Sequence, residues 1–201
     1  MRSVITPQYF YVWSKQFEGE VPHIYLDVKG LATIGIGNLI DPFGAAQTLP
    51  FVRADGSPAS AAEIEAEWLL IKSHTELARQ GYRAAGKLCR LHLEPEAIAI
   101  LVQSKNNANW AWMRDHYFPG IEAWPACAQL GACSMAWAIG AGWPAIFKRL
   151  AAACKAQDWA TASKQCSIST KGNPGVAPRN AAVIALFAKA AAQSPEEYDS
   201  L

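Results

Sequence analysis

The sequence lacks a strong charge of either sign. Its 18 Lys and Arg residues nearly balance its 17 Asp and Glu residues, and the formal net charge is +1. Lys and Arg form no basic cluster along the chain, so the electrostatic footprint of a nucleic-acid-binding protein is missing. We expect no nucleic-acid partner, and an anionic substrate would have to be met by local groups.

Long apolar runs are also lacking. No window reaches the roughly 18 consecutive apolar residues that a membrane-spanning helix needs, so we expect no membrane span. The first residues, Met1 to Pro7, contain no apolar core of the length that secretory signal peptides have. We therefore expect a protein that is made in the cytoplasm without a signal peptide.

The spacing that a zinc site requires is missing as well. The four His residues are scattered and the five Cys residues include no C-x-x-C pair, which argues against a metal site. We expect neither a metal nor a cofactor. Two interpretations stay open for the cysteines: buried structural thiols, a common state of free Cys, or one disulfide in an oxidising compartment. They are Cys89, Cys127, Cys133, Cys154 and Cys166.

What the chain does contain is apolar and aromatic residues. Apolar residues make up 51% of the 201 positions, and eight residues are Trp, a composition typical of globular rather than disordered proteins. This length suits one domain with an ample core and room for two lobes.

Helix signals lie on both sides of a short strand-like region. Thr6-Pro7 predicts a helix start, with Thr as the N-cap and Pro in the first turn, and we expect this helix to carry Glu18 near its C-terminal end. Ser60 and Glu63 have the spacing of a capping box. From residue 91 onward the chain is predicted to be helical. Further helix starts are expected at Pro95, Pro125, Pro144 and Pro178.

The segment between the first two helices has the period of a β-hairpin. In residues 24–27 apolar side chains alternate with Tyr25 and Asp27, and in residues 31–36 they alternate with Thr33. We expect the apolar set to pack inward, which would leave Tyr25, Asp27 and Thr33 on the open face.

Two acidic residues and one hydroxyl-bearing residue in this region lie at a defined spacing. Asp27 lies nine positions after Glu18, and Thr33 six positions after Asp27. Two carboxyl groups facing each other across a cleft are the minimum equipment for glycoside hydrolysis. The alternative is an ordinary surface turn with solvated acids, in which Thr33 serves strand propensity. Glu20 is a competing acid, but it should point elsewhere and is interpreted as a surface carboxylate.

At these residues the sequence resembles the phage-type lysozymes, glycoside hydrolase family 24. In that family a Glu-Gly pair is followed by an Asp nine residues after the Glu, and six later by the Thr of a Thr-Ile-Gly-Ile-Gly run. Here Glu18-Gly19, Asp27 and Thr33-Ile34-Gly35-Ile36-Gly37 match that pattern without a gap. The segments 134–140 and 175–179 resemble more loosely the family's central helix and the entry to a late helix. Asn180 stands where many members have a second basic residue.

The resemblance implies an α+β, lysozyme-like fold. A small β-hairpin lobe at about residues 20–58 and a larger helical lobe of residues 1–19 and 59–201 would form one domain, 1–201, with a cleft between the lobes. It also implies a muramidase that hydrolyses the β-1,4 bond between N-acetylmuramic acid and N-acetylglucosamine, with inversion. The partner would be peptidoglycan glycan strands in the periplasm or cell wall, reached by release or delivery.

Each catalytic candidate has an implied part in this reaction. Glu18 would protonate the glycosidic oxygen, Asp27 would stabilise the sugar's charge or act as base, and Thr33 would position the water. The protein could serve as an endolysin or as an antibacterial effector, and an immunity protein is expected only for the second. One alternative is a lytic transglycosylase, although such enzymes work with the Glu alone. Another is an inactive wall-binding or phage structural module.

Substrate-binding candidates are less clearly marked. Trp110 and the neighbouring Trp112, close to Asn107, either form a platform for sugar stacking or belong to the core. Arg179 either contacts the substrate or caps a helix. Asn38, which follows the glycine run, is expected to shape a loop.

Overall fold

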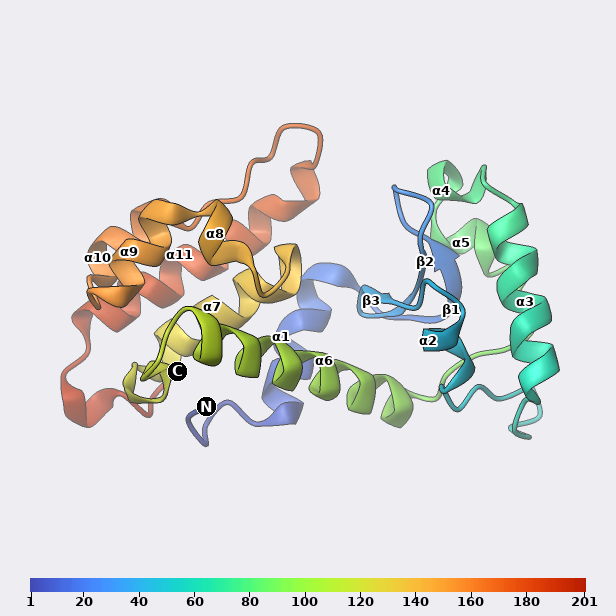
Figure 1. Cartoon of the computed structure of the whole chain (residues 1–201), viewed down its shortest axis with the longest axis horizontal. Helices are drawn as coiled ribbons and strands as arrows, with labels where there is room; N and C mark the ends of the chain where they lie inside the picture. Colours follow the sequence, from blue (N-terminus) through green and yellow to red (C-terminus); the bar gives the residue numbers. More distant parts are fainter. The chain divides into compact units, whose positions relative to one another are not determined.

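The computed structural model describes all 201 residues, and the chain divides into two compact units (Figure 1). Met1–Phe17 and Ser104–Leu201 form the helical unit, and Glu18–Gln103 form the sheet unit. The fold is α+β, as expected, with a single three-stranded antiparallel sheet. No helix combines the length and the apolar character that crossing a bilayer requires.

The sheet has the strand order β1-β2-β3, with β1 at Val21–Leu26, β2 at Ala32–Gly35 and β3 at Asn38–Leu39. The predicted alternation is confirmed, because the apolar set of the hairpin is almost wholly buried. Its members are Ile24, Leu26, Ala32, Ile34 and Ile36. One face of the hairpin therefore belongs to the core, and the other carries the polar residues.

Four helices lie wholly within the sheet unit: α2 (Gly44–Gln47), α3 (Ala61–Ser73), α4 (Leu77–Gln80) and α5 (Tyr82–Ala85). The predicted capping box begins α3, with Ser60 Oγ accepting from the backbone N–H of Glu63 and the Glu63 carboxylate accepting from that of Ser60. Because α3, α4 and α5 all pack against β1, the sheet unit extends to Gln103. It is larger than the residues 20–58 expected for a β lobe.

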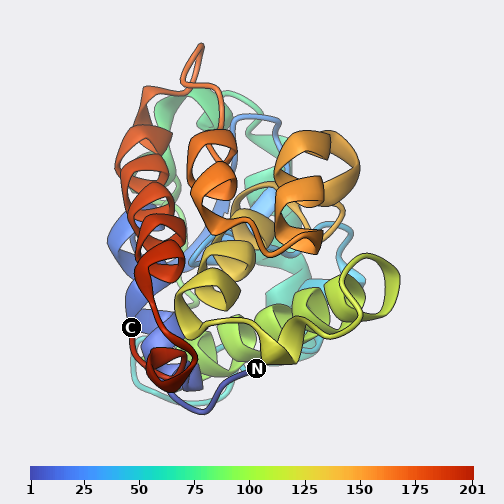
Figure 2. The same ribbon diagram turned by 90° about the vertical axis from the view of Figure 1, so that its left-hand side faces the viewer.

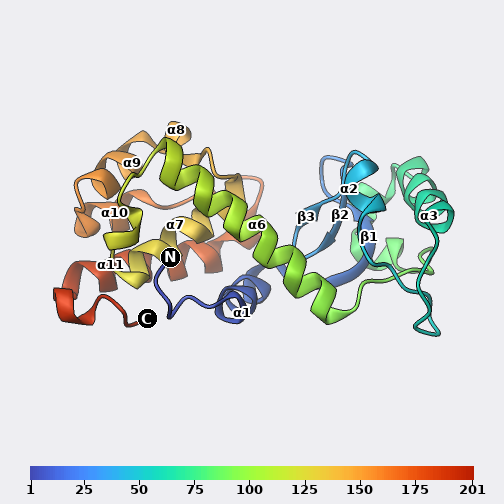
Figure 3. The ribbon, with the colours of Figure 1, turned by 60° about the horizontal axis from the view of Figure 1, so that its bottom comes forward.

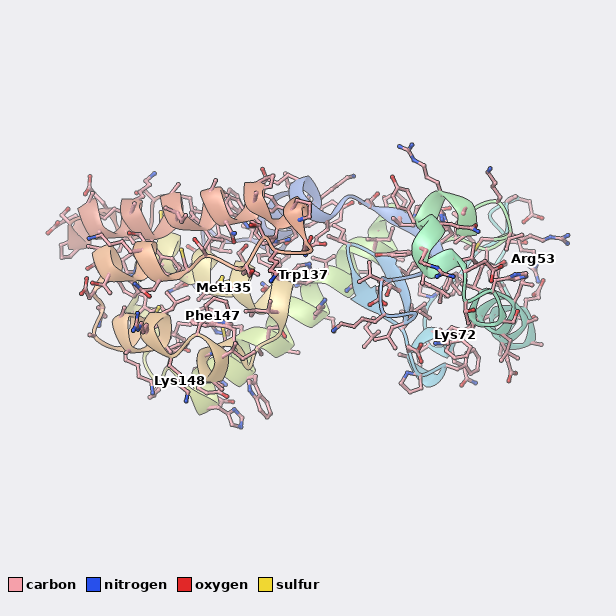
Figure 4. The ribbon with its side chains drawn as sticks, turned by 90° about the horizontal axis from the view of Figure 1, so that it is seen from above. Arg53, Lys72, Met135, Trp137, Phe147 and Lys148 are labelled. Carbon is pink, nitrogen blue, oxygen red and sulfur yellow. The ribbon has the colours of Figure 1, made fainter.

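An ion pair fastens α3 to the hairpin. Lys72, labelled in Figure 4, donates from Nζ to the carbonyl oxygen of Gly30 at 2.9 Å and to Asp41 Oδ2 at 2.6 Å. Asp41 Oδ2 also accepts from the backbone N–H of Ala32 at 3.1 Å. These bonds lower the pKa of Asp41, the hydrogen bond from Lys72 contributing most. The hairpin is thus held both by Lys72 of α3 and by the Asp41 carboxylate, which bond to its backbone.

The helical unit is built around α7 (Ala126–Ile139), in which every residue from Ala126 to Trp137 is buried. Figure 2 shows α11 (Ala177–Ala192) beside α10 (Trp159–Gln165), and α11 also packs on α7. The long helix α6 (Pro95–His116) is a single unbroken helix in Figure 3, and the boundary between the units falls within it. The remaining helices are α1 (Pro7–Glu18), α8 (Trp143–Ile146), α9 (Lys148–Lys155), and the 3-10 turns η1 (Ile121–Ala123), η2 (Pro174–Val176) and η3 (Pro195–Glu197).

The helix starts expected at prolines are confirmed. Pro95 begins α6, Pro125 is the N-cap of α7, and Pro144 and Pro178 lie in the first turns of α8 and α11. All five cysteines are free thiols, and only Cys89 is not fully buried. The structure therefore favours buried thiols over a disulfide.

Candidate functional site

Glu18 is placed by the end of a helix. Thr6 Oγ1 accepts from the backbone N–H of Tyr9 at 3.0 Å and so caps the start of α1, and Glu18 is its last residue, as predicted. Gly19, at a φ of +72°, then turns the chain toward β1. A Cβ placed on Gly37 would lie 3.7 Å from Glu18 Oε2. The exposed Glu18 carboxyl therefore lies close to the backbone at Gly37, the end of the glycine run.

Asp27 is placed by the hairpin turn that it also closes. Its Oδ1 accepts from the backbone N–H groups of Lys29 at 2.8 Å and Leu31 at 2.9 Å. The backbone N–H of Gly30 donates to the Asp27 carbonyl at 2.9 Å, and Gly30 has a φ of +76°. Both side-chain bonds fall on Oδ1, so Oδ2 takes no part in the turn.

Thr33 shares a face with Tyr25, as predicted, but the expectation that this face leaves Thr33 open is wrong. Thr33 is only 5% exposed. It lies on the middle strand, where its Cα is paired with Tyr25 on one side and Leu39 on the other, so neighbouring strands flank it on both sides. Its hydroxyl donates to the carbonyl oxygen of Leu31 at 3.1 Å.

Tyr25 links these three residues. It is paired with Thr33 across the ladder and lies two residues before Asp27, hence on the same face of β1. Burial raises the pKa of Tyr25 to about 12, and the negative charges of Glu18 and Asp27 contribute to that rise. Both carboxyl groups therefore act electrostatically on one phenol. Tyr25 is thus the residue of the sheet unit with which all three interact: Thr33 by strand pairing, and Glu18 and Asp27 through their charges.

Tyr25 is also the residue whose part in the site sequence reasoning missed. The signal was present, because Tyr25 and Asp27 occupy alternate positions of one strand. Asn38, expected to shape a loop, is the first residue of β3, and its side chain bonds the turn before it. It is 2% exposed, and its Oδ1 accepts from the backbone N–H of Ile36 at 3.2 Å, which holds the turn between β2 and β3.

The substrate-binding candidates all belong to the helical unit, with Asn107 and Trp110 one turn apart on α6 and Arg179 on α11. Trp110 is 7% exposed, which favours the core alternative, whereas Asn107 and Trp112 are exposed on α6. Trp112 stacks on His116 with ring centroids 3.8 Å apart. A flat aromatic surface is therefore present on α6 at Trp112 rather than at Trp110.

Arg179 is 2% exposed and ties α11 to α7. Its Nη1 donates to Ser134 Oγ at 3.1 Å and to the Ser134 carbonyl at 3.4 Å. The guanidinium also lies 4.9 Å from the ring centroid of Phe17. These contacts give Arg179 a packing role at the central helix.

A separate hollow of about 870 Å³ lies elsewhere in the sheet unit and includes none of the three motif residues. Two of its basic side chains already have partners: Arg53 binds Glu63 through Nε at 2.8 Å, and His23 Nε2 bonds the carbonyl oxygen of Tyr82 at 2.9 Å. Nowhere in the chain do three or more His, Cys, Asp or Glu side chains form a group that could hold a metal ion.

Comparisons with protein-family models and with curated proteins find no match for this chain.

Proposed function

We propose that this protein is a peptidoglycan muramidase with a lysozyme-like fold, which hydrolyses the β-1,4 bond between N-acetylmuramic acid and N-acetylglucosamine. The observation that carries the proposal is that Tyr25 is paired with Thr33 on the sheet and feels the charges of both Glu18 and Asp27. The three residues come from a helix end, a turn and a middle strand. Their spacing in the sequence matches the phage-type lysozyme motif.

Glu18 is the proposed general acid. Its carboxyl is exposed at the end of α1, where a bound sugar can reach it. It protonates the glycosidic oxygen while the sugar ring acquires oxocarbenium character. The leaving sugar then departs as an alcohol, which lowers the barrier to bond cleavage.

Asp27 and Thr33 are the proposed water-handling groups. Asp27 Oδ2, which the turn does not use, accepts one proton of the attacking water. The Thr33 proton is already donated to Leu31, so Thr33 Oγ1 serves as an acceptor for the water's other hydrogen. Attack from the face opposite the leaving group inverts the anomeric carbon, a geometry that needs carboxyl groups roughly 6.5–9.5 Å apart.

The proposed substrate locates the protein's work in the cell wall, after release or delivery from the cytoplasm. The same hydrolysis reaction is compatible with a role in phage lysis and with a role in attack on other bacteria. An immunity protein belongs to the second use only.

A turbidity assay on permeabilised Gram-negative cells tests the proposal, with Glu18→Gln as the matched control. We expect the wild-type protein to clear the suspension and the variant to do so far more slowly. Mass spectrometry of the released muropeptides should then show reducing ends. Anhydro ends would identify a lytic transglycosylase instead, and wall binding without any clearing would identify an inactive module.

A further inference from the structure

The Tyr25 hydroxyl is a hydrogen-bond donor that the protein itself does not use. The ring is half-buried in the sheet unit, but its hydroxyl makes no hydrogen bond within the protein. The ring is nevertheless held in place. Thr33 lies opposite it on β2, and Tyr82 of α5 meets it edge-on, with centroids 6.4 Å apart and planes at 68°. A fixed ring with an unused hydroxyl is suited to binding something outside the chain.

The other groups at this site are mainly acceptors. Asp27 is an acceptor, and the Thr33 proton is committed to Leu31. Glu18 has one proton to donate, and the proposed reaction transfers it to the glycosidic oxygen. An N-acetylated sugar presents hydroxyl and acetamide oxygens that need donors. Tyr25 is the neutral group on this face that can supply one.

We propose that the Tyr25 hydroxyl donates a hydrogen bond to an oxygen of the N-acetylhexosamine bound between Glu18 and Asp27, which makes Tyr25 a substrate-binding residue. This inference rests on the proposed function and deepens it. Because the pKa of Tyr25 is about 12, the phenol stays protonated, and so remains a donor, throughout the neutral range.

Two other roles for Tyr25 would give different results. Tyr25 could act only as packing between β1 and α5, or it could act through Asp27 by donating to its carboxylate. The packing role needs the ring but not the hydroxyl. The role through Asp27 would change how the rate depends on pH, since a donor to a carboxylate favours its ionised form.

The test compares Tyr25→Phe with Tyr82→Phe. Each change removes one phenolic hydroxyl and keeps the ring, and Tyr82 has no part in the proposed hydrogen bond. For Tyr25→Phe we expect the rate of wall lysis to fall by about 3- to 10-fold, the size of one neutral hydrogen bond. The melting temperature should stay within error of the wild type, because no bond within the protein is lost. Tyr82→Phe should match the wild type in both measurements.

A binding measurement locates the effect on the substrate. In the Glu18→Gln background, which prevents turnover, calorimetry with a purified peptidoglycan tetrasaccharide should show a dissociation constant about 3- to 10-fold higher for Tyr25→Phe. The pH–rate profile of Tyr25→Phe should be lowered uniformly, with its acid limb in place. A shifted acid limb would overturn the inference in favour of action through Asp27, and a matching loss of melting temperature would overturn it in favour of packing.

The two proposals fail in distinguishable ways. If the wild-type protein does not lyse walls, the proposed function fails. If the wild type and Tyr25→Phe lyse walls equally and bind the tetrasaccharide equally, only the inference about Tyr25 fails.

Discussion

Asp27 and Leu31 close the hairpin turn through reciprocal hydrogen bonds. The backbone N–H of Asp27 donates to the Leu31 carbonyl at 3.0 Å, and the backbone N–H of Leu31 donates to Asp27 Oδ1 at 2.9 Å. The carboxylate that we propose for chemistry is therefore also part of the turn that positions it. One oxygen serves the fold, and the other is available to the reaction.

This division predicts that two substitutions at Asp27 will differ. Asp27→Asn keeps an oxygen for the turn and loses the charge, so we expect near-normal stability and turnover reduced by about 10²–10⁴. Asp27→Ala also loses the two bonds to the turn, and its free energy of unfolding should drop by about 1–3 kcal/mol. Urea titrations and turbidity assays measure the two effects. Equal stability of both variants would show that the turn does not depend on this side chain.

Glu18→Gln should leave the fold intact and reduce wall lysis by about 10²–10⁴, because the side chain keeps its size but loses the transferable proton. Glu20→Gln is the matched control, since it makes the same chemical change two positions along the chain. Circular dichroism checks the fold of each, and turbidity gives the rates. If Glu20→Gln proved the damaging change and Glu18→Gln the harmless one, the general acid would be assigned to the wrong residue.

Thr33→Val should impair the reaction more than the fold. The Leu31 carbonyl that accepts from Thr33 also accepts from the backbone N–H of Asp27, so it stays bonded and the loss of stability should stay within about 1 kcal/mol. Turnover should drop at least tenfold, and Thr33→Ser, which keeps the hydroxyl, should recover most of it. Because Thr33 and Asp27 act on one step, the double variant Thr33→Val/Asp27→Asn should lose less than the product of the single losses. If the loss of turnover in the double variant equalled the product of the single losses, Thr33 and Asp27 would act independently, which would contradict the prediction.

Glu63 predicts a specific dependence of stability on pH. Hydrogen bonds from Arg53 and from Ser60 lower its pKa to about 2, from an ordinary value of 4.5. The folded state thus binds fewer protons than the unfolded state in this range, so the stabilisation is complete above about pH 4.5 and is lost as the pH falls toward about 2. The melting temperature of Glu63→Gln should lie below that of the wild type at neutral pH and approach it in acid. Glu65→Gln, on the same helix, is the control, and a gap for Glu63→Gln that did not narrow in acid would contradict the prediction.

Local chemistry was enough to predict the helix limits and the hairpin. Thr6-Pro7 and the pair Ser60 and Glu63 mark helix starts by contacts within a few residues, and the turn at Asp27 is likewise closed by its neighbours. The period-2 alternation was also sufficient to separate the buried face of the hairpin from the face that carries Tyr25 and Asp27. The catalytic roles of Glu18, Asp27 and Thr33 stay predictions until activity is measured.

Only the tertiary structure decided which of these side chains are covered and what they meet. Thr33 is buried and is flanked by Tyr25 on β1 and Leu39 on β3, and the period of one strand does not specify which residues will lie beside it. Arg179 packs on Ser134, 45 positions away in the chain, and Tyr25 comes under the influence of Glu18 through the path that Gly19 and β1 take. Spacing along the chain specifies local hydrogen bonds and faces, whereas burial and electrostatic coupling depend on distances that exist only after distant segments have packed.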